Sequence, residues 1–90
     1  MAHLINIGFG NMVNGDKIVS MVSTEAAPIK RMIQTSRDEG KAVDATCGRR
    51  TRTALVMESG HVVLSALTTE TIAARCFDRK NEAREEENHG

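Results

Sequence analysis

Apolar side chains change their spacing along the chain, and each change of spacing predicts a different element of secondary structure. Short runs rich in Ile, Val and Leu lie at residues 3–8 and 16–23, which is typical of β-strands. Asn14 and Gly15 stand between these runs, and Asn-Gly is a favoured dipeptide for a tight hairpin turn. The N-terminal part of the chain is therefore expected to form two strands joined by that turn.

A helical spacing of apolar positions follows the second predicted strand. The repeat of three and four residues places one stripe along a helix, and this stripe consists of Ile29, Met32, Ile33 and Ser36. Pro28 is tolerated only in the first turn of a helix, and Gly40 supplies a left-handed stop. We expect the regular helix at about 28–39, capped by Ser23 or Thr24. The stripe predicts positions in the core or at an interface between protomers.

Three more strands and a short helix are predicted in the C-terminal half of the chain. The strands lie at 41–46, 53–59 and 61–67, with a hairpin turn at Ser59-Gly60, and the helical segment lies at 68–77 with Thr69 as its N-cap. The resulting order, strand-strand-helix-strand-strand-strand-helix, indicates an α+β fold. We expect a small, mostly antiparallel sheet with one main helix and a short C-terminal helix.

Length and charge divide the chain into one domain and a tail. Ninety residues allow one domain, which we place at 1–77. Residues 78–90 are strongly charged and contain one apolar residue, Ala83, so we expect this tail to be disordered. The formal net charge of the whole chain is zero, but residues 1–75 carry nine Lys or Arg and seven Asp or Glu. The acidic tail therefore conceals a mildly basic domain.

The predicted core is small and poor in aromatic side chains. The chain contains two Phe, no Tyr and no Trp. A domain of this size and composition has a thin margin of stability. Self-association is a common remedy, so we expect the protein to form a homo-oligomer.

Most motifs that carry chemistry are incomplete in this sequence. Gly8 and Gly10 begin a dinucleotide-binding fingerprint, but Val13 occupies the place of its third glycine. We expect a tight turn with positive φ there instead. The His and Cys residues show no metal-ligand spacing, and Cys47 has no identifiable catalytic partner. The sequence therefore predicts no enzyme, no metal or other cofactor and no small-molecule substrate.

Membrane segments and secretion signals are not expected either. The sequence has no apolar run of about 18 residues and no recognisable signal-peptide core. Its two cysteines lack the spacing of a disulfide framework, which suits a reducing compartment. We expect a cytoplasmic protein without a membrane partner.

The most one-sided electrostatic feature of the chain is a cluster of three arginines. Arg49, Arg50 and Arg52 lie in a window between Asp44 and Glu58 that contains no acidic residue. A planar guanidinium suits bidentate contacts to phosphate or guanine, and neighbouring Thr hydroxyls are typical phosphate donors. Three arginines make a weak nucleic-acid site, so this interpretation requires several chains to present the cluster together. The alternative from composition alone is a solvated loop.

Several of these segments together resemble one known family. From about residue 4 to residue 76 the chain is similar to the RemA family of bacterial regulators of extracellular-matrix genes. The resemblance is carried by INIGFGNMVN (5–14), APIKRMIQTSRDEGK (27–41), DATCGRRTR (44–52) and HVVLSALTTETIAAR (61–75). It implies a LytTR-like protomer in a ring-shaped, heptamer-like homo-oligomer that binds double-stranded DNA around its edge. It also implies transcriptional activation, notably of matrix genes in biofilm-forming bacteria, and a place at the nucleoid.

The resemblance also implies roles for individual residues. Its DNA-binding positions are Arg49, Arg50 and Lys17, with Arg52 as a further candidate. Lys17 stands where the family has an arginine, so the charge is kept but the bidentate fork is lost. Pro28 matches a proline important to the family's architecture, with Ile29, Met32 and Ile33 beside it. Cys47 stands where the family commonly has a tyrosine.

Other functions stay open at the level of the sequence. An oligomeric structural or protein-interaction module would pair the arginines with carboxylates of a neighbouring protomer, for which the candidates are Asp38, Glu39 and Asp44. A nucleoid-organising protein would bind DNA without promoter specificity. RNA recognition is disfavoured because single strands are normally bound on aromatic platforms, and the aromatic side chains are those of Phe9 and Phe77 alone.

Overall fold

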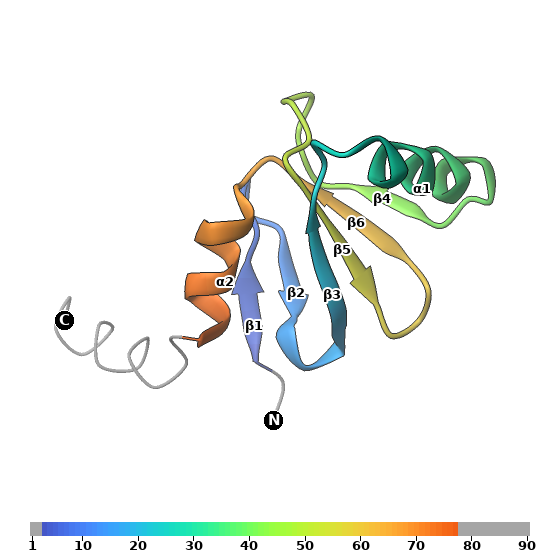
Figure 1. Ribbon diagram of the computed structural model, residues 1–90. Coiled ribbons are helices and arrows are strands. Elements are labelled where there is room, and N and C mark those ends of the chain that lie inside the picture. The colour runs from blue at the N-terminus through green and yellow to red at the C-terminus, as the bar shows by residue number, and fades with distance from the viewer. Residues whose placement is uncertain (1–2, 78–90) are drawn as a thin grey trace, which may run out of the picture.

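The computed structural model describes residues 3–77, which form two sheets and two α-helices (Figure 1). In chain order the elements are β1 (Leu4–Asn6), β2 (Met12–Asn14), the 3₁₀ turn η1 (Gly15–Lys17), β3 (Ile18–Ser23), α1 (Ala27–Asp38), β4 (Ala42–Asp44), β5 (Thr53–Met57), β6 (Val62–Ser65) and α2 (Thr69–Phe77). Strands β1 and β2 pair with each other, and the remaining four strands form a sheet in the order β3-β5-β6-β4. All pairs are antiparallel except β4 with β6. This confirms the predicted α+β fold with a mostly antiparallel sheet.

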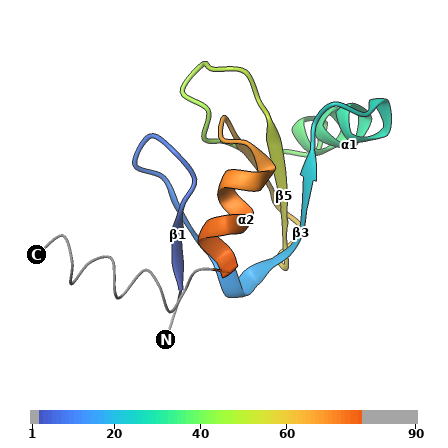
Figure 2. The ribbon, with the colours of Figure 1, turned by 60° about the vertical axis from the view of Figure 1, so that its left-hand side comes forward.

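The four-stranded sheet carries an apolar cluster on each face, because neighbouring residues of a strand point to opposite sides. One cluster joins Leu55 and Val63 of the sheet to Ile5, Ile7, Ala45 and Ile72. The other joins Ala54, Val62 and Leu64 of the sheet to Met32 and Ile33 of α1. The β1–β2 hairpin and α2 therefore cover one face, and α1 covers the other (Figure 2).

The first hairpin lies earlier in the chain than predicted. Gly8, Phe9 and Gly10 all have positive φ, at 108°, 55° and 77°, so the expected tight turn is present and reverses the chain between β1 and β2. The prediction of a hairpin at Asn14-Gly15 was wrong. The Asn14 side chain instead accepts a hydrogen bond of 3.0 Å from the Asp16 amide, which starts η1 and leads the chain into β3.

Helix α1 begins without the predicted side-chain cap. Its N-cap is Ala26, with no capping hydrogen bond from a side chain, and Pro28 lies in its first turn. The prediction of a Ser23 or Thr24 cap was wrong, because Ser23 ends β3 and the Thr24 hydroxyl donates to the Thr51 carbonyl at 2.8 Å. The C-terminal stop is confirmed at Gly40, which has a φ of 72°.

The apolar stripe of α1 faces the sheet as expected. Met32 and Ile33 are partly buried against the second cluster, and Ile29 is half-buried. Ser36 is buried and its hydroxyl donates to the Met32 carbonyl at 2.9 Å. The core role of the stripe is thus confirmed for Met32 and Ile33.

Helix α2 begins one residue later than its cap, which is Thr68 and not the predicted Thr69. The Thr68 hydroxyl accepts a hydrogen bond of 3.2 Å from the Thr71 amide, and Ile72 of the next turn is fully buried. The predicted hairpin at Ser59-Gly60 is confirmed, with Gly60 at a φ of 93°. Within residues 3–77, neither helix combines the length and apolar character needed to cross a bilayer. The predicted tail at 78–90 lies outside the described residues.

Candidate nucleic-acid interface

The three arginines lie on the connection between β4 and β5, which we call the arginine turn (residues 46–52). Cys47 and Gly48 both have positive φ, at 53° and 78°, and the Arg49 amide donates to the Thr46 carbonyl at 3.0 Å. Two consecutive left-handed residues inside such a hydrogen bond are the signature of a type I′ turn. The connection that carries the arginines lies at one end of the molecule (Figure 1).

Asp44 anchors the start of the arginine turn. One of its carboxylate oxygens accepts from both the amide and the hydroxyl of Thr46, at 2.9 Å and 2.6 Å. These two hydrogen bonds hold the pKa of Asp44 below its ordinary value of 3.8 against the opposing effect of burial, and the positive charge of Arg37 makes the smallest contribution in the same direction as the hydrogen bonds. Asp44 is therefore a charged acceptor that fixes the turn from within its own chain.

A second turn lies beside the arginine turn: the glycine turn (residues 8–10). The Arg49 Cζ atom is 5.8 Å from the centroid of the Phe9 ring, a separation typical of a cation–π contact. The Asn11 side-chain amide donates to the carbonyls of Gly8 and Ala45, at 3.0 Å and 3.4 Å. The two turns are therefore joined by polar and aromatic contacts.

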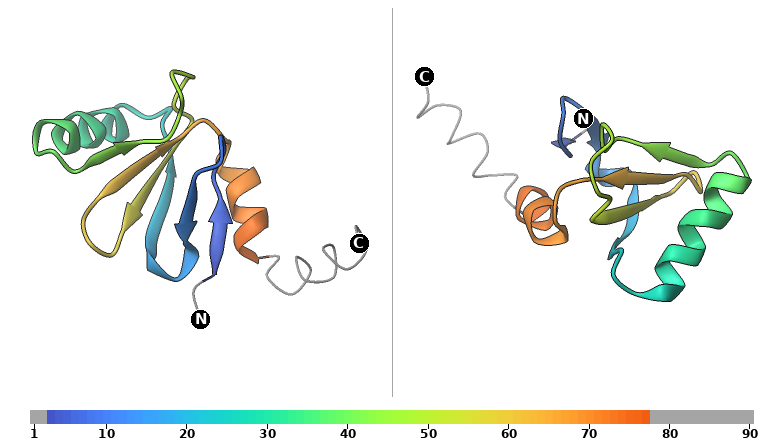
Figure 3. Two further views of the ribbon diagram at one scale, coloured as in Figure 1. Left: turned by 180° about the vertical axis from the view of Figure 1, so that it is seen from behind. Right: turned by 90° about the horizontal axis from the view of Figure 1, so that it is seen from above.

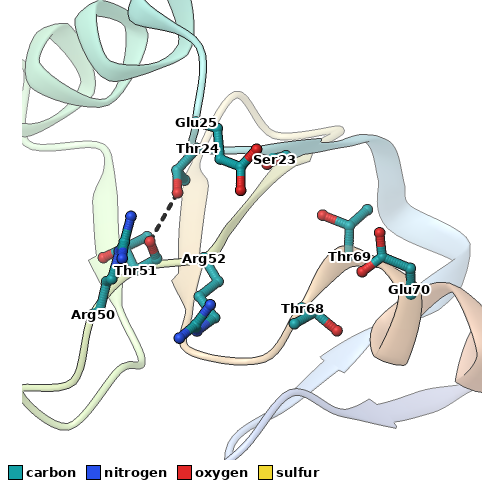
Figure 4. A pocket seen from close by; sticks show the side chains of 9 residues that line it. All are labelled: Ser23, Thr24, Glu25, Arg50, Thr51, Arg52, Thr68, Thr69 and Glu70. Carbon is teal, nitrogen blue, oxygen red and sulfur yellow. Dashed lines mark hydrogen bonds between the residues drawn. The ribbon is translucent and has the colours of Figure 1, made fainter.

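Arg50 and Arg52 line a polar hollow of about 270 Å³ (Figure 4). The hollow is formed where the arginine turn meets the β3–α1 connection and the start of α2, and its lining is Ser23, Thr24, Glu25, Arg50, Thr51, Arg52, Thr68, Thr69 and Glu70. The backbone around Arg52 is held on both sides, because its amide donates to the Ser65 carbonyl at 2.8 Å and its carbonyl accepts from the Thr24 amide at 3.3 Å.

Charge is divided across this hollow. Arg50 and Arg52 come from one wall, whereas Glu25 and Glu70 come from the opposite elements. Neither arginine forms a salt bridge with another residue of 3–77. Both guanidinium groups are therefore free to bind an anion that approaches from the side of the arginine turn.

Lys17 is the last residue of η1, a turn that lies at the far end of the sheet from the arginine turn (Figure 3). It directly precedes β3 and forms a salt bridge of 3.7 Å with Glu58, next to the β5–β6 turn. Ser23, which lines the hollow, is the last residue of β3 and lies six positions after Lys17. Six positions span roughly 20 Å at the rise of an extended strand. The fold therefore brings together Arg49, Arg50 and Arg52, but it does not bring Lys17 to them.

Some residues of this region could not be found from the sequence. Phe9, Thr24 and Thr68 come from elements far from the arginines in the chain, so only the tertiary fold reveals them. The Asp44-x-Thr46 spacing was a readable signal, because Asp often accepts a hydrogen bond from the amide two residues on. In residues 3–77 no three His, Cys, Asp or Glu side chains gather in a way that could hold a metal ion.

The chain is similar to known proteins over nearly the whole of its described part. The family described as RemA-like, extracellular matrix regulatory protein A-like, matches residues 4–76. The chain belongs to the RemA-like family. It is 58% identical to extracellular matrix regulatory protein A of Bacillus subtilis over 72 residues, which cover 80% of this chain and 81% of that protein.

Two further relatives, from other bacteria, are similarly close to this chain. A relative from Lachnoclostridium phytofermentans is 57% identical over 81 residues, covering 90% of this chain and 89% of its own. A relative from Acaryochloris marina is 56% identical over 78 residues, covering 87% and 89%. Both relatives carry names of regulatory proteins, which supports a regulator.

Proposed function

We propose that this RemA-like protein is a DNA-binding transcriptional regulator of the activator type that works as a ring-shaped homo-oligomer. The observation that carries the proposal is the arrangement of the arginines. Arg50 and Arg52 line one hollow, Arg49 lies on the same turn, and the window from 45 to 57 contains no acidic residue. This arrangement concentrates positive charge at one end of the molecule.

Duplex DNA is the partner that fits this surface best. Guanidinium groups bind phosphate in a bidentate manner, and the hydroxyl of Thr51, which also lines the hollow, is of a kind that commonly donates to phosphate. The glutamates of the opposite wall repel phosphate, so the DNA backbone would lie over the arginine turn and away from Glu25 and Glu70. RNA is less suitable, because the aromatic side chain at this surface, Phe9, already has Arg49 over one face.

Oligomerisation raises the affinity for DNA above that of a single arginine turn. Each phosphate contact adds a modest, salt-dependent increment, and linked copies of a weak site bind far more tightly than one copy. Large apolar side chains are available for contacts between protomers: Leu4, Met12, Val19 and Val43 are 48–67% exposed. The proposal includes a LytTR-like protomer in a ring at the nucleoid, in the cytoplasm, as the family resemblance implies.

The test compares matched charge removals in a gel-shift assay with duplex DNA. Arg49→Ala/Arg50→Ala removes two charges of the arginine turn, and the control Lys30→Ala/Arg31→Ala removes two exposed charges of α1. We expect the first variant to lose DNA binding by at least tenfold while its particle mass in light scattering stays that of the parent. The control should bind within about twofold of the parent. If the first variant binds DNA as tightly as the parent, DNA recognition by the arginine turn is refuted.

A structural or protein-interaction module is the second candidate. The divided charge of the hollow favours it, because an arginine wall and a glutamate wall suit a partner protein that presents both charges. In that case Arg49→Ala/Arg50→Ala would shift the particle to a smaller mass. The combination of unchanged mass and lost DNA binding separates the regulator from this alternative, and binding to many unrelated duplexes would indicate a nucleoid organiser.

A further inference from the structure

Phe9 is an exposed aromatic residue in an unfavourable backbone conformation. Its side chain is 51% exposed and belongs to neither apolar cluster. Its φ of 55° lies in the left-handed region, which disfavours every residue with a Cβ atom. Glycines flank Phe9 on both sides. Neither core packing nor backbone preference explains why position 9 is a phenylalanine.

The contact that Phe9 makes is with Arg49. The guanidinium carbon lies 5.8 Å from the ring centroid, where the negative face of the ring attracts a cation. Arg49 is a surface side chain with many rotamers, and an arginine loses conformational entropy when a phosphate immobilises it. A ring that already holds the guanidinium in place reduces this loss.

The glycine turn is held firmly enough to set the position of the ring. Its two ends are tied by hydrogen bonds from the Asn11 side-chain amide to the Ala45 carbonyl and from the Ser65 hydroxyl to the Ile7 carbonyl, at 3.4 Å and 2.7 Å. A Cβ atom on Gly8 would lie 3.3 Å from the Leu67 side chain, so the turn also packs closely on the β6–α2 connection. Phe9 is therefore a fixed platform beside the Arg49 side chain.

We propose that Phe9 is a positioning residue of the DNA surface, which acts by holding the Arg49 guanidinium over its ring in the orientation that meets a backbone phosphate. This inference rests on the proposed function and adds to it a residue outside the basic cluster. The ring acts through Arg49 and makes no stacking contact with a base. Phe9 and Arg49 therefore form one functional unit built from two turns.

A double-mutant cycle tests whether Phe9 acts through Arg49. Phe9→Leu keeps an apolar side chain with the same backbone constraint but removes the π face, and Phe9→Tyr restores the face. We expect Phe9→Leu to weaken duplex binding by about two- to fivefold for each protomer in contact, the range of an exposed cation–π contact, and Phe9→Tyr to bind like the parent. In an Arg49→Ala background, measured at low salt, Phe9→Leu should have no further effect.

Two results would overturn the inference. Parent-like binding by Phe9→Leu would show that the ring does not matter, and an equal loss in the Arg49→Ala background would show that the ring contacts DNA itself. Particle mass and melting temperature of each variant report whether it folds and assembles.

A second measurement needs neither DNA nor a substitution. In the parent, the ring current of Phe9 should shift the Arg49 Hδ resonances upfield, and shifts typical of a free arginine would contradict the contact. The parent's own DNA binding is scored separately, so failure of the proposed function is distinguishable from failure of the Phe9 inference.

Discussion

At the residue scale, Cys47 adopts a strained backbone conformation that lets the arginine turn reverse the chain tightly. Its φ of 53° is unfavourable for a side chain with a Cβ atom. We predict that Cys47→Gly raises the free energy of unfolding by up to about 1 kcal/mol, measured by denaturant titration at matched protein concentration. Thr51→Gly, at a position without positive φ, should lower it because glycine adds entropy to the unfolded chain. A similar loss in both variants would contradict the strained turn.

The charge of Asp44 makes the stability of the arginine turn dependent on pH. The pKa of Asp44 is lowered in the folded protein by its hydrogen bonds from Thr46, so its contribution is fully present above the unfolded pKa and is lost as pH falls through the lowered folded pKa. We predict that Asp44→Asn costs about 0.5–1 kcal/mol near neutral pH, since a charged acceptor is stronger than a neutral one.

The pH profile of the two proteins provides the check. Unfolding of the parent and of Asp44→Asn should be followed by circular dichroism from pH 7 down to about pH 2. The difference between them should be constant above about pH 5 and shrink below the ordinary pKa of 3.8. A difference that stays constant to the lowest pH would show that the charge of Asp44 contributes nothing.

What the sequence reveals about single residues follows from how local the signal is. The arginine cluster could be predicted because its three members are neighbours in the chain without an intervening acid. The contact between Phe9 and Arg49 could not, because it joins two turns that are far apart in the sequence. The hydroxyls of Thr24 and Thr68 converge on the hollow for the same tertiary reason.

At the element scale, the type of most elements was predictable, whereas their boundaries depended on competing hydrogen bonds. Apolar periodicity correctly indicated α1, α2 and the β5–β6 hairpin. The Asn14-Gly15 dipeptide misled because the flanking glycines of Phe9 make an earlier reversal. Thr24 failed as a cap because the Thr51 carbonyl takes its hydroxyl, a partner that no local pattern reveals.

The uncapped start of α1 yields a prediction about stability. Ala26 is the N-cap and offers no side-chain acceptor to the first free amides of the helix. We predict that Ala26→Asp stabilises the protein by about 1 kcal/mol, through a cap hydrogen bond and a favourable charge at the helix start. Thermal and denaturant unfolding measure this gain. Ala26→Asn, which caps without charge, should recover most of it, and no gain from either variant would mean that the helix start does not limit stability.

At the scale of the whole molecule, the two ends of the sheet carry different basic residues. The family resemblance groups Lys17 with the arginines as a DNA-binding position. The pairing of β3 with β5 shows that Lys17 and the arginines lie at opposite ends of these two strands. The number of protomers and their arrangement cannot be predicted from one chain, because exposed side chains such as Leu4 and Val19 specify no partner surface by themselves.

The separation of Lys17 from Arg50 predicts independent contributions to DNA binding. Sites that share no partner have additive effects, and each lost phosphate contact lowers the salt slope by about one. We therefore expect the binding free-energy losses of Lys17→Gln and Arg50→Gln to add in the double variant, in anisotropy titrations with labelled duplex. A loss in the double variant equal to that of Arg50→Gln alone would show that Lys17 does not contact DNA.

The most direct test of the central claim is the mass of the particle in solution, measured by light scattering with and without duplex DNA at rising salt. The account predicts a homo-oligomer that gains the mass of bound DNA at low salt and releases it steeply as salt increases. The oligomer itself should persist after the DNA is released. A monomer at every protein concentration, or DNA binding that is insensitive to salt, would contradict the account.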